Sequence, residues 1–249
     1  MDIISELAQF YDNQADKFHN TRKKHWPEFD LILKQIQDYE ADEIKILELG
    51  CGSGRLLKYL NENTTKKIKY NGVDISNNLI QIARLENPSG QFIVADMISY
   101  MEMQSHESFD LIIAFASFQH IGSKKERLII LKNIYKSLKY GGLCIMSNWS
   151  YSQRFFNKYK IETLKALLRM IYTGGFYKYN DYFIPWKSGD IIFRRYYHIF
   201  TIKELKVLFN LSGFITKISS YCNVDGSLSG DYRNSRNTFF VGEKNVIEN

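Results

Sequence analysis

The sequence predicts a single α/β domain built on a mainly parallel, doubly wound β-sheet. The chain has 249 residues, 45% of them hydrophobic, which is enough for one sizeable core. From about residue 45 to 150, short apolar runs alternate with segments of helical spacing, and this order produces parallel sheets covered by helices. A glycine-rich loop directly follows the first apolar run and precedes a helical segment.

The expected strands are short apolar runs, as strands buried on both faces of a sheet should be. Five lie in the alternating region: Lys45–Leu49, Tyr70–Asp74, Gln91–Ala95, Phe109–Ala114 and Gly142–Asn148. Two later runs, Ile215–Ser220 and Thr238–Glu243, are expected to close the sheet.

The expected helices have apolar residues at spacings of three and four. They are Glu6–Phe18, Pro27–Tyr39, Arg55–Asn61, Asn77–Asn87, Lys124–Tyr140 and Ile161–Tyr172. A last helix is expected to begin after Thr201, which forms a capping-box pattern with Glu204, and to end near Ser212.

We expect one domain with four consecutive parts. Residues 1–44 form an N-terminal helical cap, and residues 45–149 form the ligand-binding core. Residues 150–200 form a basic, aromatic insertion, and residues 201–244 supply the last helix and the closing strands.

Composition limits the class of protein. The formal charge of +6 is compatible with a polyanionic partner without requiring one. Three widely separated cysteines and five histidines show no ligand spacing, so no metal site is expected. An acidic N-terminus without an apolar stretch, and the lack of any apolar run of membrane-spanning length, predict a cytoplasmic protein with reduced cysteines.

The glycine loop reads Glu48-Leu-Gly-Cys-Gly-Ser-Gly54, directly after the first strand. Glycines are needed where a Cβ would collide with a ligand or where φ is positive. The loop alone also fits a dinucleotide site, but that pattern requires glycine at position 55, where Arg55 stands. Acids end the next two strands, Asp74 at 20 residues past Gly54 and then Asp96.

Together these residues resemble motif I and the following strand ends of the class I S-adenosylmethionine (SAM) methyltransferases. The resemblance implies a sheet of order 3-2-1-4-5-7-6 with strand 7 antiparallel, and SAM as cofactor with S-adenosylhomocysteine as product. It implies that the glycines make room for SAM. Considered alone, each of these acidic residues could instead be a solvated strand end or a helix cap. The implied cofactor-binding residues are Glu48, Gly50, Cys51, Gly52, Gly54, Asp74, Ile75, Asp96, Met97 and Phe115.

The methyl acceptor is constrained by motifs that the chain lacks. The residues after the fourth expected strand, Phe115–His120, read FASFQH rather than the Asn/Asp-Pro-Pro-Tyr/Phe that marks methylation of planar amines in the family. There is no paired-cysteine arrangement like that of the 5-methylcytosine enzymes. A carboxylate acceptor needs no base, because it is already ionised at neutral pH.

Two flanking stretches are more specific. The N-terminal one is Tyr11-Asp-Asn-Gln-Ala-Asp-Lys-Phe18, followed by Thr21-Arg-Lys-Lys-His-Trp-Pro27. The late one is Phe183-Ile-Pro-Trp186, followed by Arg194-Arg-Tyr-Tyr-His-Ile-Phe200 and Glu204-Leu205. They resemble the eukaryotic tRNA methyltransferases that esterify 5-carboxymethyluridine at wobble position 34, and the resemblance covers about residues 7–244. It implies the tRNA anticodon loop as substrate and a small zinc-binding activator subunit as partner.

The resemblance assigns six residues to substrate and chemistry. Arg22, His120 and Arg195 match its catalytic positions, the two arginines as ligands of a carboxylate or a phosphate. Trp26, Tyr197 and His198 match its substrate-binding positions. The alternatives are a core role for Trp26, a packing role for His120 and surface ion pairs for both arginines. We further expect Tyr196 and Tyr197 to split, one buried and one facing out.

Three departures from the family pattern stand in the sequence. Gln119 replaces the first of two histidines, Ser235–Phe240 replaces an aromatic-rich last strand, and Val224–Asn234 is a polar loop of unknown purpose.

The insertion concentrates the charge. Residues 151–200 carry nine basic side chains against three acids, and 15 of the 37 aromatic residues. Basic and aromatic groups together hold single-stranded RNA, whose target base must be turned out to react. A lid over a small-molecule pocket or an aromatic-rich dimer interface would have the same composition.

The preferred hypothesis is therefore a SAM-dependent tRNA methyltransferase acting on a carboxymethylated wobble uridine. The second is methylation of a small molecule, such as a carboxylic acid or another oxygen acceptor. The third is a non-catalytic SAM-binding subunit, against which the intact glycine loop with Asp74 and Asp96 argues. The sequence leaves the oligomeric state open.

Overall fold

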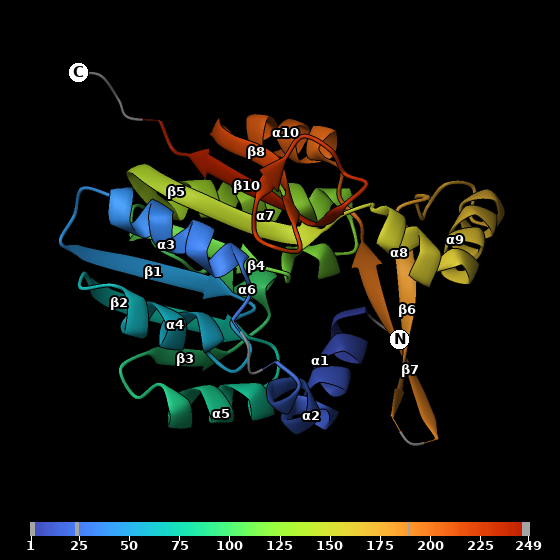
Figure 1. Cartoon of the computed structure of the whole chain (residues 1–249), viewed down its shortest axis with the longest axis horizontal. Helices are drawn as coiled ribbons and strands as arrows, with labels where there is room; N and C mark the ends of the chain where they lie inside the picture. The colour runs from blue at the N-terminus through green and yellow to red at the C-terminus, as the bar shows by residue number, and fades with distance from the viewer. Residues whose placement is uncertain (1–2, 23–24, 189, 246–249) are drawn as a thin grey trace.

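The computed structural model of the chain describes residues 3–22, 25–188 and 190–245. Its centre is an eight-stranded sheet of order β3-β2-β1-β4-β5-β10-β8-β9 (Figure 1). A separate two-stranded sheet pairs β6 with β7. The strands are β1 (Glu43–Leu49), β2 (Lys67–Asp74), β3 (Gln91–Val94), β4 (Phe109–Phe115), β5 (Leu138–Trp149), β6 (Asp181–Ser188), β7 (Ile191–His198), β8 (Ile215–Asn223), β9 (Leu228–Ser229) and β10 (Ser235–Glu243).

The helices connect and cover these strands. They are α1 (Ile3–Asn13), α2 (Ala15–Asn20), α3 (Glu28–Asp38), α4 (Arg55–Asn63), α5 (Asn77–Glu86), α6 (Met97–Glu102), α7 (Lys124–Ser137), α8 (Gln153–Lys158), α9 (Lys160–Tyr172) and α10 (Ile202–Leu211), with a 3₁₀ turn η1 (Phe118–His120).

The strand order confirms the predicted topology. Strands β1 to β5 pair in parallel, and β10 pairs antiparallel with both β5 and β8. Hence β10 and β8 take the places of strands 7 and 6 in the predicted 3-2-1-4-5-7-6 order. The short edge strand β9 is an addition that the sequence did not indicate.

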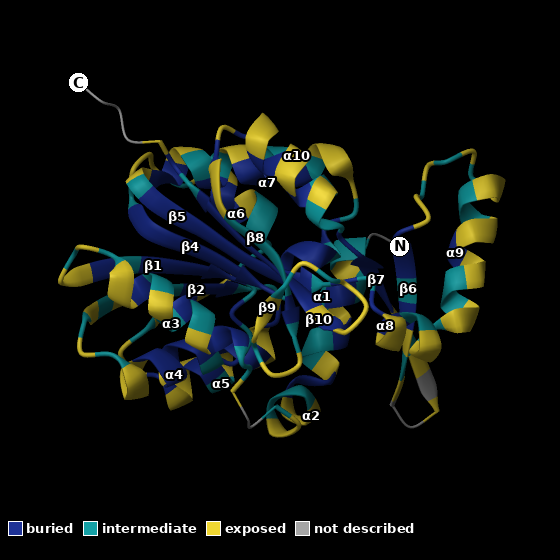
Figure 2. Cartoon of the chain, turned by 45° about the horizontal axis from the view of Figure 1, so that its top comes forward, coloured by how far each residue is buried: buried dark blue, intermediate teal, exposed yellow. Residues whose placement is uncertain are grey.

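Alternating side chains of the strands supply two cores, one on each face of the sheet. Ile44 and Ile46 of β1 join the cluster under α3 and α4, whereas Leu47 and Leu49 join the cluster under α7 and α10. The side-chain period of two explains this division, and central strands such as β4 are buried on both faces. The sheet is dark blue between its helical layers in Figure 2.

Two predicted boundaries are wrong. The helix expected to reach Tyr140 ends at Ser137, because Leu138 is already extended and pairs with Phe109 at the start of β5. The single helix expected from Glu6 to Phe18 is two helices, α1 and α2, separated at Gln14. The break lets α1 lie against β7 while α2 turns toward α5, as Figure 1 shows.

The insertion between β5 and α10 has its own small core. Tyr182 and Ile184 of β6 pack with Tyr197 of β7 and with Phe155 and Ala166 of α8 and α9. The hairpin β6–β7 was not predicted, because buried aromatic residues on both of its faces remove the apolar–polar alternation of a half-buried strand. Within the described residues, no helix combines the length and apolar character needed to cross a membrane.

Candidate functional site

The cavity lined by most of the predicted site residues, which we call the main cavity, lies at the carboxyl ends of β1, β2 and β4 and is closed from the other side by α1 and α2. Its volume is about 230 Å³, and Ile3, Leu7 and Tyr11 of α1 form part of its wall. In parallel sheets this edge is the usual ligand site. Twelve predicted residues line the cavity: Arg22, Trp26, Glu48, Gly50, Cys51, Gly52, Asp74, Ile75, Asp96, Met97, Phe115 and His120.

Only one of the three loop glycines leaves open space at the cavity. An added Cβ at Gly52 (φ +54°) would meet no heavy atom within 4 Å. At Gly54, which does not line the cavity, a Cβ would lie 2.7 Å from Asn87 Nδ2 and 3.1 Å from Phe92. The expectation that all three glycines make room for a ligand is thus wrong for Gly54, whose lack of a side chain lets α4 pack against its neighbours.

Gly50 is required by its neighbour across the sheet edge. Its φ is +79°, and an added Cβ would lie 2.3 Å from Ser117 Cβ. We expect Gly50→Ala to lower the free energy of unfolding by about 2–5 kcal/mol, since positive-φ strain and overpacking add. Chemical denaturation checks this, with Gly230→Ala, which meets nothing within 4 Å, as control. A loss below about 1 kcal/mol in Gly50→Ala would show that Ser117 moves aside.

Asp74 joins the first two strand ends. Its Oδ2 accepts a hydrogen bond from Gly52 N at 2.8 Å, and its Oδ1 accepts one from Ser76 N at 2.9 Å. Burial raises the pKa of Asp74, and these backbone donors oppose the rise. A carboxylate has about four acceptor positions. The two bonds therefore leave capacity to accept from a ligand diol at the cavity.

Glu48 is a buried carboxyl at the base of the cavity. It is 4% exposed and accepts a hydrogen bond from the Tyr70 hydroxyl. Burial raises its pKa to about 8, and the charge of Asp74 adds to the rise. Glu48 is therefore largely protonated at neutral pH, and a cationic ligand group would favour its ionised form.

The end of β3 forms an apolar part of the wall. Asp96 caps α6, with its Oδ2 accepting from Ile98 N at 3.1 Å and Ser99 N at 3.0 Å. Met97, Ile98 and Ile75 line the cavity beside it. Apolar side chains with one carboxylate are suited to a flat heterocycle that carries a hydrogen-bond donor.

His120 is held between the cavity wall and the insertion. Its Nδ1 lies 2.8 Å from the backbone oxygen of Tyr196, and its Nε2 lies 3.1 Å from the Tyr11 hydroxyl. Because a carbonyl oxygen only accepts, Nδ1 carries the proton and Nε2 accepts from Tyr11. Burial lowers the pKa of His120 to about 4, so the ring is neutral at pH 7.

Arg22 brings a positive charge to the cavity. Its guanidinium lies 3.5 Å from the centre of the Phe18 ring and donates to Phe18 O at 3.3 Å. Burial lowers the pKa of Arg22, and the charges of Arg195 and Arg236 lower it further. Among the ion pairs of the described residues, none includes Arg22.

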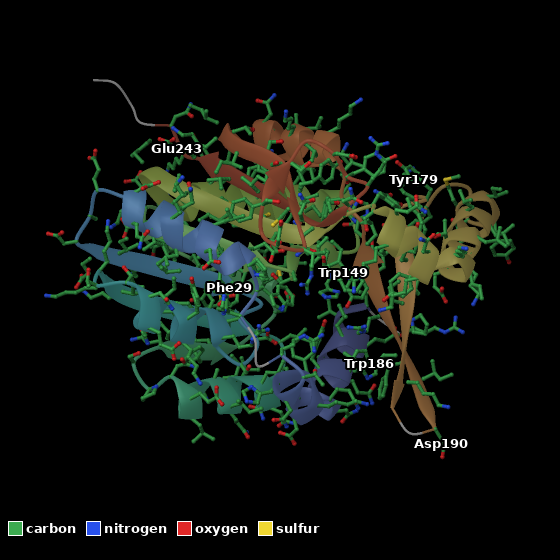
Figure 3. The ribbon with its side chains drawn as sticks, in the orientation of Figure 1. Phe29, Trp149, Tyr179, Trp186, Asp190 and Glu243 are labelled. Carbon is green, nitrogen blue, oxygen red and sulfur yellow. The ribbon has the colours of Figure 1, made fainter. Side chains whose placement is uncertain are left out.

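Arg195 lies behind the wall, not in it. It is 5% exposed, and its guanidinium carbon is 4.7 Å from the Phe10 ring centre and 4.9 Å from that of Trp186. Trp186 sits between the hairpin and α1 in Figure 3. Arg195 therefore joins the hairpin to α1 and does not line the cavity.

Tyr196 and Tyr197, which follow Arg195 in β7, do not line the cavity either. Tyr196 and Tyr197 are both 2% exposed, so the expected split between a buried and an exposed tyrosine is wrong. Tyr197 packs on His120 and stacks on Trp149 at 4.6 Å between ring centres. Tyr197 thus contacts both the small core of the insertion and the main domain.

His198 belongs to a buried polar network that joins the insertion to the domain. Its Nδ1 lies 2.6 Å from Asp181 Oδ1, and its Nε2 lies 2.9 Å from Glu204 Oε1. Arg127 of α7 approaches the same groups. Thr201 caps α10 as expected, but Glu204 turns to His198 rather than completing the capping box. His198 is 2% exposed and does not line the cavity, so its assignment as a substrate contact stays a prediction.

Two departures from the family pattern have structural explanations. Gln119 is 1% exposed, and its Oε1 accepts from Trp149 N at 2.7 Å, which ties η1 to the end of β5. The polar loop 224–234 packs on the segment after Trp26, since a Cβ at Gly226 would lie 2.7 Å from Pro27 Cβ. Tyr11, which bonds to His120, is among the cavity residues that the sequence analysis did not assign to the site, although it begins one of the flanking stretches that carry the resemblance.

Comparison with known proteins gives a family and relatives. A family model described as a methyltransferase domain matches residues 18–216. The tRNA (carboxymethyluridine(34)-5-O)-methyltransferase of Saccharomyces cerevisiae is 28% identical over 180 residues, which cover 72% of this chain and 56% of the yeast protein. The tRNA N(3)-methylcytidine methyltransferase trm140 of Schizosaccharomyces pombe is 28% identical over 184 residues, which cover 70% of this chain and 56% of that protein. The chain thus spans about half the length of these two relatives.

A solved structure shares the fold over almost the whole chain. It is a complex between the Haloferax volcanii Trm112 methyltransferase activator and a protein described as a methyltransferase. The TM-score is 0.63 at 17% identity, and the match covers 97% of this chain and 99% of that one.

Proposed function

Since the chain belongs to the methyltransferase-domain family, we propose that it esterifies the carboxylate of 5-carboxymethyluridine at the wobble position of tRNA. S-adenosylmethionine is its cofactor, and this molecule supplies an electrophilic methyl group on a sulfonium. The chain's own residues have to hold both reactants in line and keep water out.

The cavity residues fit the cofactor at three places. Asp74 keeps acceptor capacity for the ribose diol beyond its two backbone bonds. Asp96 and Met97 suit the adenine, the one as an acceptor and the other as apolar surface. Glu48, in its ionised form, suits the ammonium group of the methionine part.

The Glu48 assignment predicts proton release on cofactor binding. At pH 7 the free protein holds a proton on Glu48, whose pKa is about 8, and a nearby ammonium lowers that pKa. Titration calorimetry in buffers of different ionisation enthalpy should then detect release of roughly one proton per SAM bound at pH 7. In Glu48→Gln this release should vanish. Equal proton release by both proteins would place the ammonium elsewhere.

The position of Arg22 is the main support for a carboxylate as the methyl acceptor. Its guanidinium faces the cavity without a carboxylate partner among the described residues, beside the aromatic wall formed by Trp26 and Phe115. Such a group suits the carboxylate of an aromatic base, which it can bind in a bidentate pair.

The state of His120 agrees with an acceptor that needs no base. Its Nε2 is taken by Tyr11, and its pKa of about 4 makes it a poor proton acceptor at pH 7. An ionised carboxylate needs only to be oriented. An exocyclic amine would need a group to take its proton, and His120 is unsuited to that task.

The insertion supports RNA as the carrier of the base. Seven of its nine basic side chains are exposed: Arg154, Lys158, Lys160, Lys165, Lys178, Lys187 and Arg194. Most of its aromatic rings are used in packing, and the large exposed ones are Tyr172, Phe176 and Tyr179. The exposed basic side chains of the insertion are therefore stronger support for RNA binding than its few exposed aromatic rings are.

A transfer assay with labelled SAM tests the reaction type. We expect the methyl label to enter tRNA, so that ribonuclease treatment removes it from the macromolecular fraction. Mild alkali should also release the label, because methyl esters hydrolyse and N-methyl groups do not. Alkali-stable label would favour a reaction like that named for the methylcytidine relative. Label that survives ribonuclease would favour a small-molecule acceptor.

We also propose a small activator subunit as partner, in a cytoplasmic setting. The shared fold with the activator-bound Haloferax chain supports this, and so do the apolar side chains Ile93 and Val94, 37% and 42% exposed on the edge strand β3. Raised activity on adding an activator of that family tests the proposal, and an unchanged rate would contradict it.

A further inference from the structure

A second hollow opens beside the main cavity. It lies between α2, the start of α3 and α4, and has a volume of about 460 Å³. Arg22, Phe29 and Arg55 line both hollows, so the two adjoin at these side chains. We call the second one the α4 groove. It holds no predicted site residue except Arg22.

The α4 groove is lined by basic side chains at the end near the cavity and by acidic ones farther out. Arg55 lies in the first turn of α4, at the cavity end, and Lys58 lies one turn further on. Lys58 is exposed and makes no ion pair within the described part of the chain. The acids lie farther out, with Glu62 near the end of α4 and Glu86 paired with His19 at 3.1 Å. The positive end therefore adjoins the cavity.

An aromatic pair, His25 and Tyr59, also lines the groove. The exposed His25 ring stacks on Tyr59, with 5.2 Å between ring centres and 29° between planes. Tyr59 is fixed by a hydrogen bond from its hydroxyl to Asp30. The outer face of His25 is thus a fixed, flat surface next to Lys58.

We propose that the α4 groove binds the nucleotide next to the methylated one in a single RNA strand. Lys58 and Arg55 take the linking phosphate, and the neighbouring base stacks on His25. Graded positive charge beside a stacking surface is the arrangement that holds single-stranded nucleic acid. The groove and the cavity share Arg22, Phe29 and Arg55, and two adjoining sites suit two nucleotides joined by one phosphate. This inference rests on RNA being the substrate.

The test measures binding of an anticodon stem-loop that carries 5-carboxymethyluridine at the wobble position. Fluorescence anisotropy is recorded over a range of salt concentrations at pH 8, where an imidazole is ordinarily neutral. We expect Lys58→Ala to weaken binding about 5-fold and to reduce the slope of log K against log[salt] by about 0.7. His25→Ala should weaken binding at least about 5-fold with an unchanged slope. Affinity for SAM should stay that of the wild type in both variants.

Lys206 is an exposed lysine of α10, a helix at the top of Figure 1, whereas α2 and α4 lie in the lower half of that view. Lys206→Ala is the matched control and should bind RNA like the wild type. Wild-type affinity and slope in Lys58→Ala and His25→Ala would overturn the groove assignment and leave the proposed function standing. A wild-type protein that neither binds nor methylates the stem-loop would overturn the proposed function itself, and the groove assignment with it.

Discussion

Arg22→Ala is expected to lower kcat/KM for the RNA substrate by about 10²- to 10³-fold. A bidentate guanidinium–carboxylate pair contributes about 3–4 kcal/mol when it orients a reacting group, and each 1.4 kcal/mol is tenfold in rate. The free energy of unfolding should change little, because Arg22 is only half-buried and its side-chain hydrogen bonds go to Phe18 and Thr21 in the neighbouring turn. Steady-state kinetics with saturating SAM measures the effect.

Arg22→Lys separates charge from geometry. A lysine keeps the charge but loses the planar fork, so an intermediate loss of about tenfold is expected. Calorimetry should show SAM affinity within about twofold of the wild type in both variants. A large fall in SAM affinity, with normal turnover at saturating SAM, would instead assign Arg22 to the carboxylate of the cofactor.

Asp74→Asn is expected to weaken SAM binding by about 100-fold or more, and to abolish turnover at ordinary SAM concentrations. Hydrogen bonds to a charged acceptor contribute about 1.5–3 kcal/mol each, and the ribose offers two hydroxyl donors. The amide also replaces one acceptor oxygen by a donor. That donor would face Gly52 N–H or Ser76 N–H, whichever way the amide turns. Equilibrium dialysis or calorimetry measures the change.

Asp12→Asn is the matched control for Asp74→Asn. Asp12 also accepts hydrogen bonds at the start of α5, from Ser76 Oγ at 2.7 Å and Asn78 N at 3.0 Å, but it does not line the cavity. SAM affinity in this variant should stay within about threefold. Equal losses in the two variants would mean that the loop geometry, rather than the carboxylate at the cavity, controls binding.

The core of the fold was predictable because its signals are local. β4 is buried along its whole length, and all of its residues except Asp110 are apolar. Glycines at positive φ and acids at strand ends stand at fixed distances along the chain. The cavity wall built from β1, β2 and β3 therefore followed from residue order alone, and the structure places Glu48, Asp74 and Asp96 together there.

The insertion was less predictable because its side chains are satisfied by distant partners. Arg195 and His198 have the residue types of a binding site, yet Arg195 packs among the rings of Phe10 and Trp186, and His198 bonds to Asp181 and Glu204. Nothing in their local sequence distinguishes a buried network from a ligand contact. Tyr11 was missed for the reverse reason, since its bond to His120 spans 109 positions.

Nucleoside mass spectrometry is the most direct test of the central claim. tRNA carrying 5-carboxymethyluridine is incubated with the protein and methyl-labelled SAM, with and without an activator subunit, and digested under conditions that preserve esters. The account predicts a labelled methyl ester of the wobble nucleoside, lost in Arg22→Ala and retained in Lys206→Ala. An unlabelled wobble nucleoside in both incubations, from protein that still binds SAM, would contradict it.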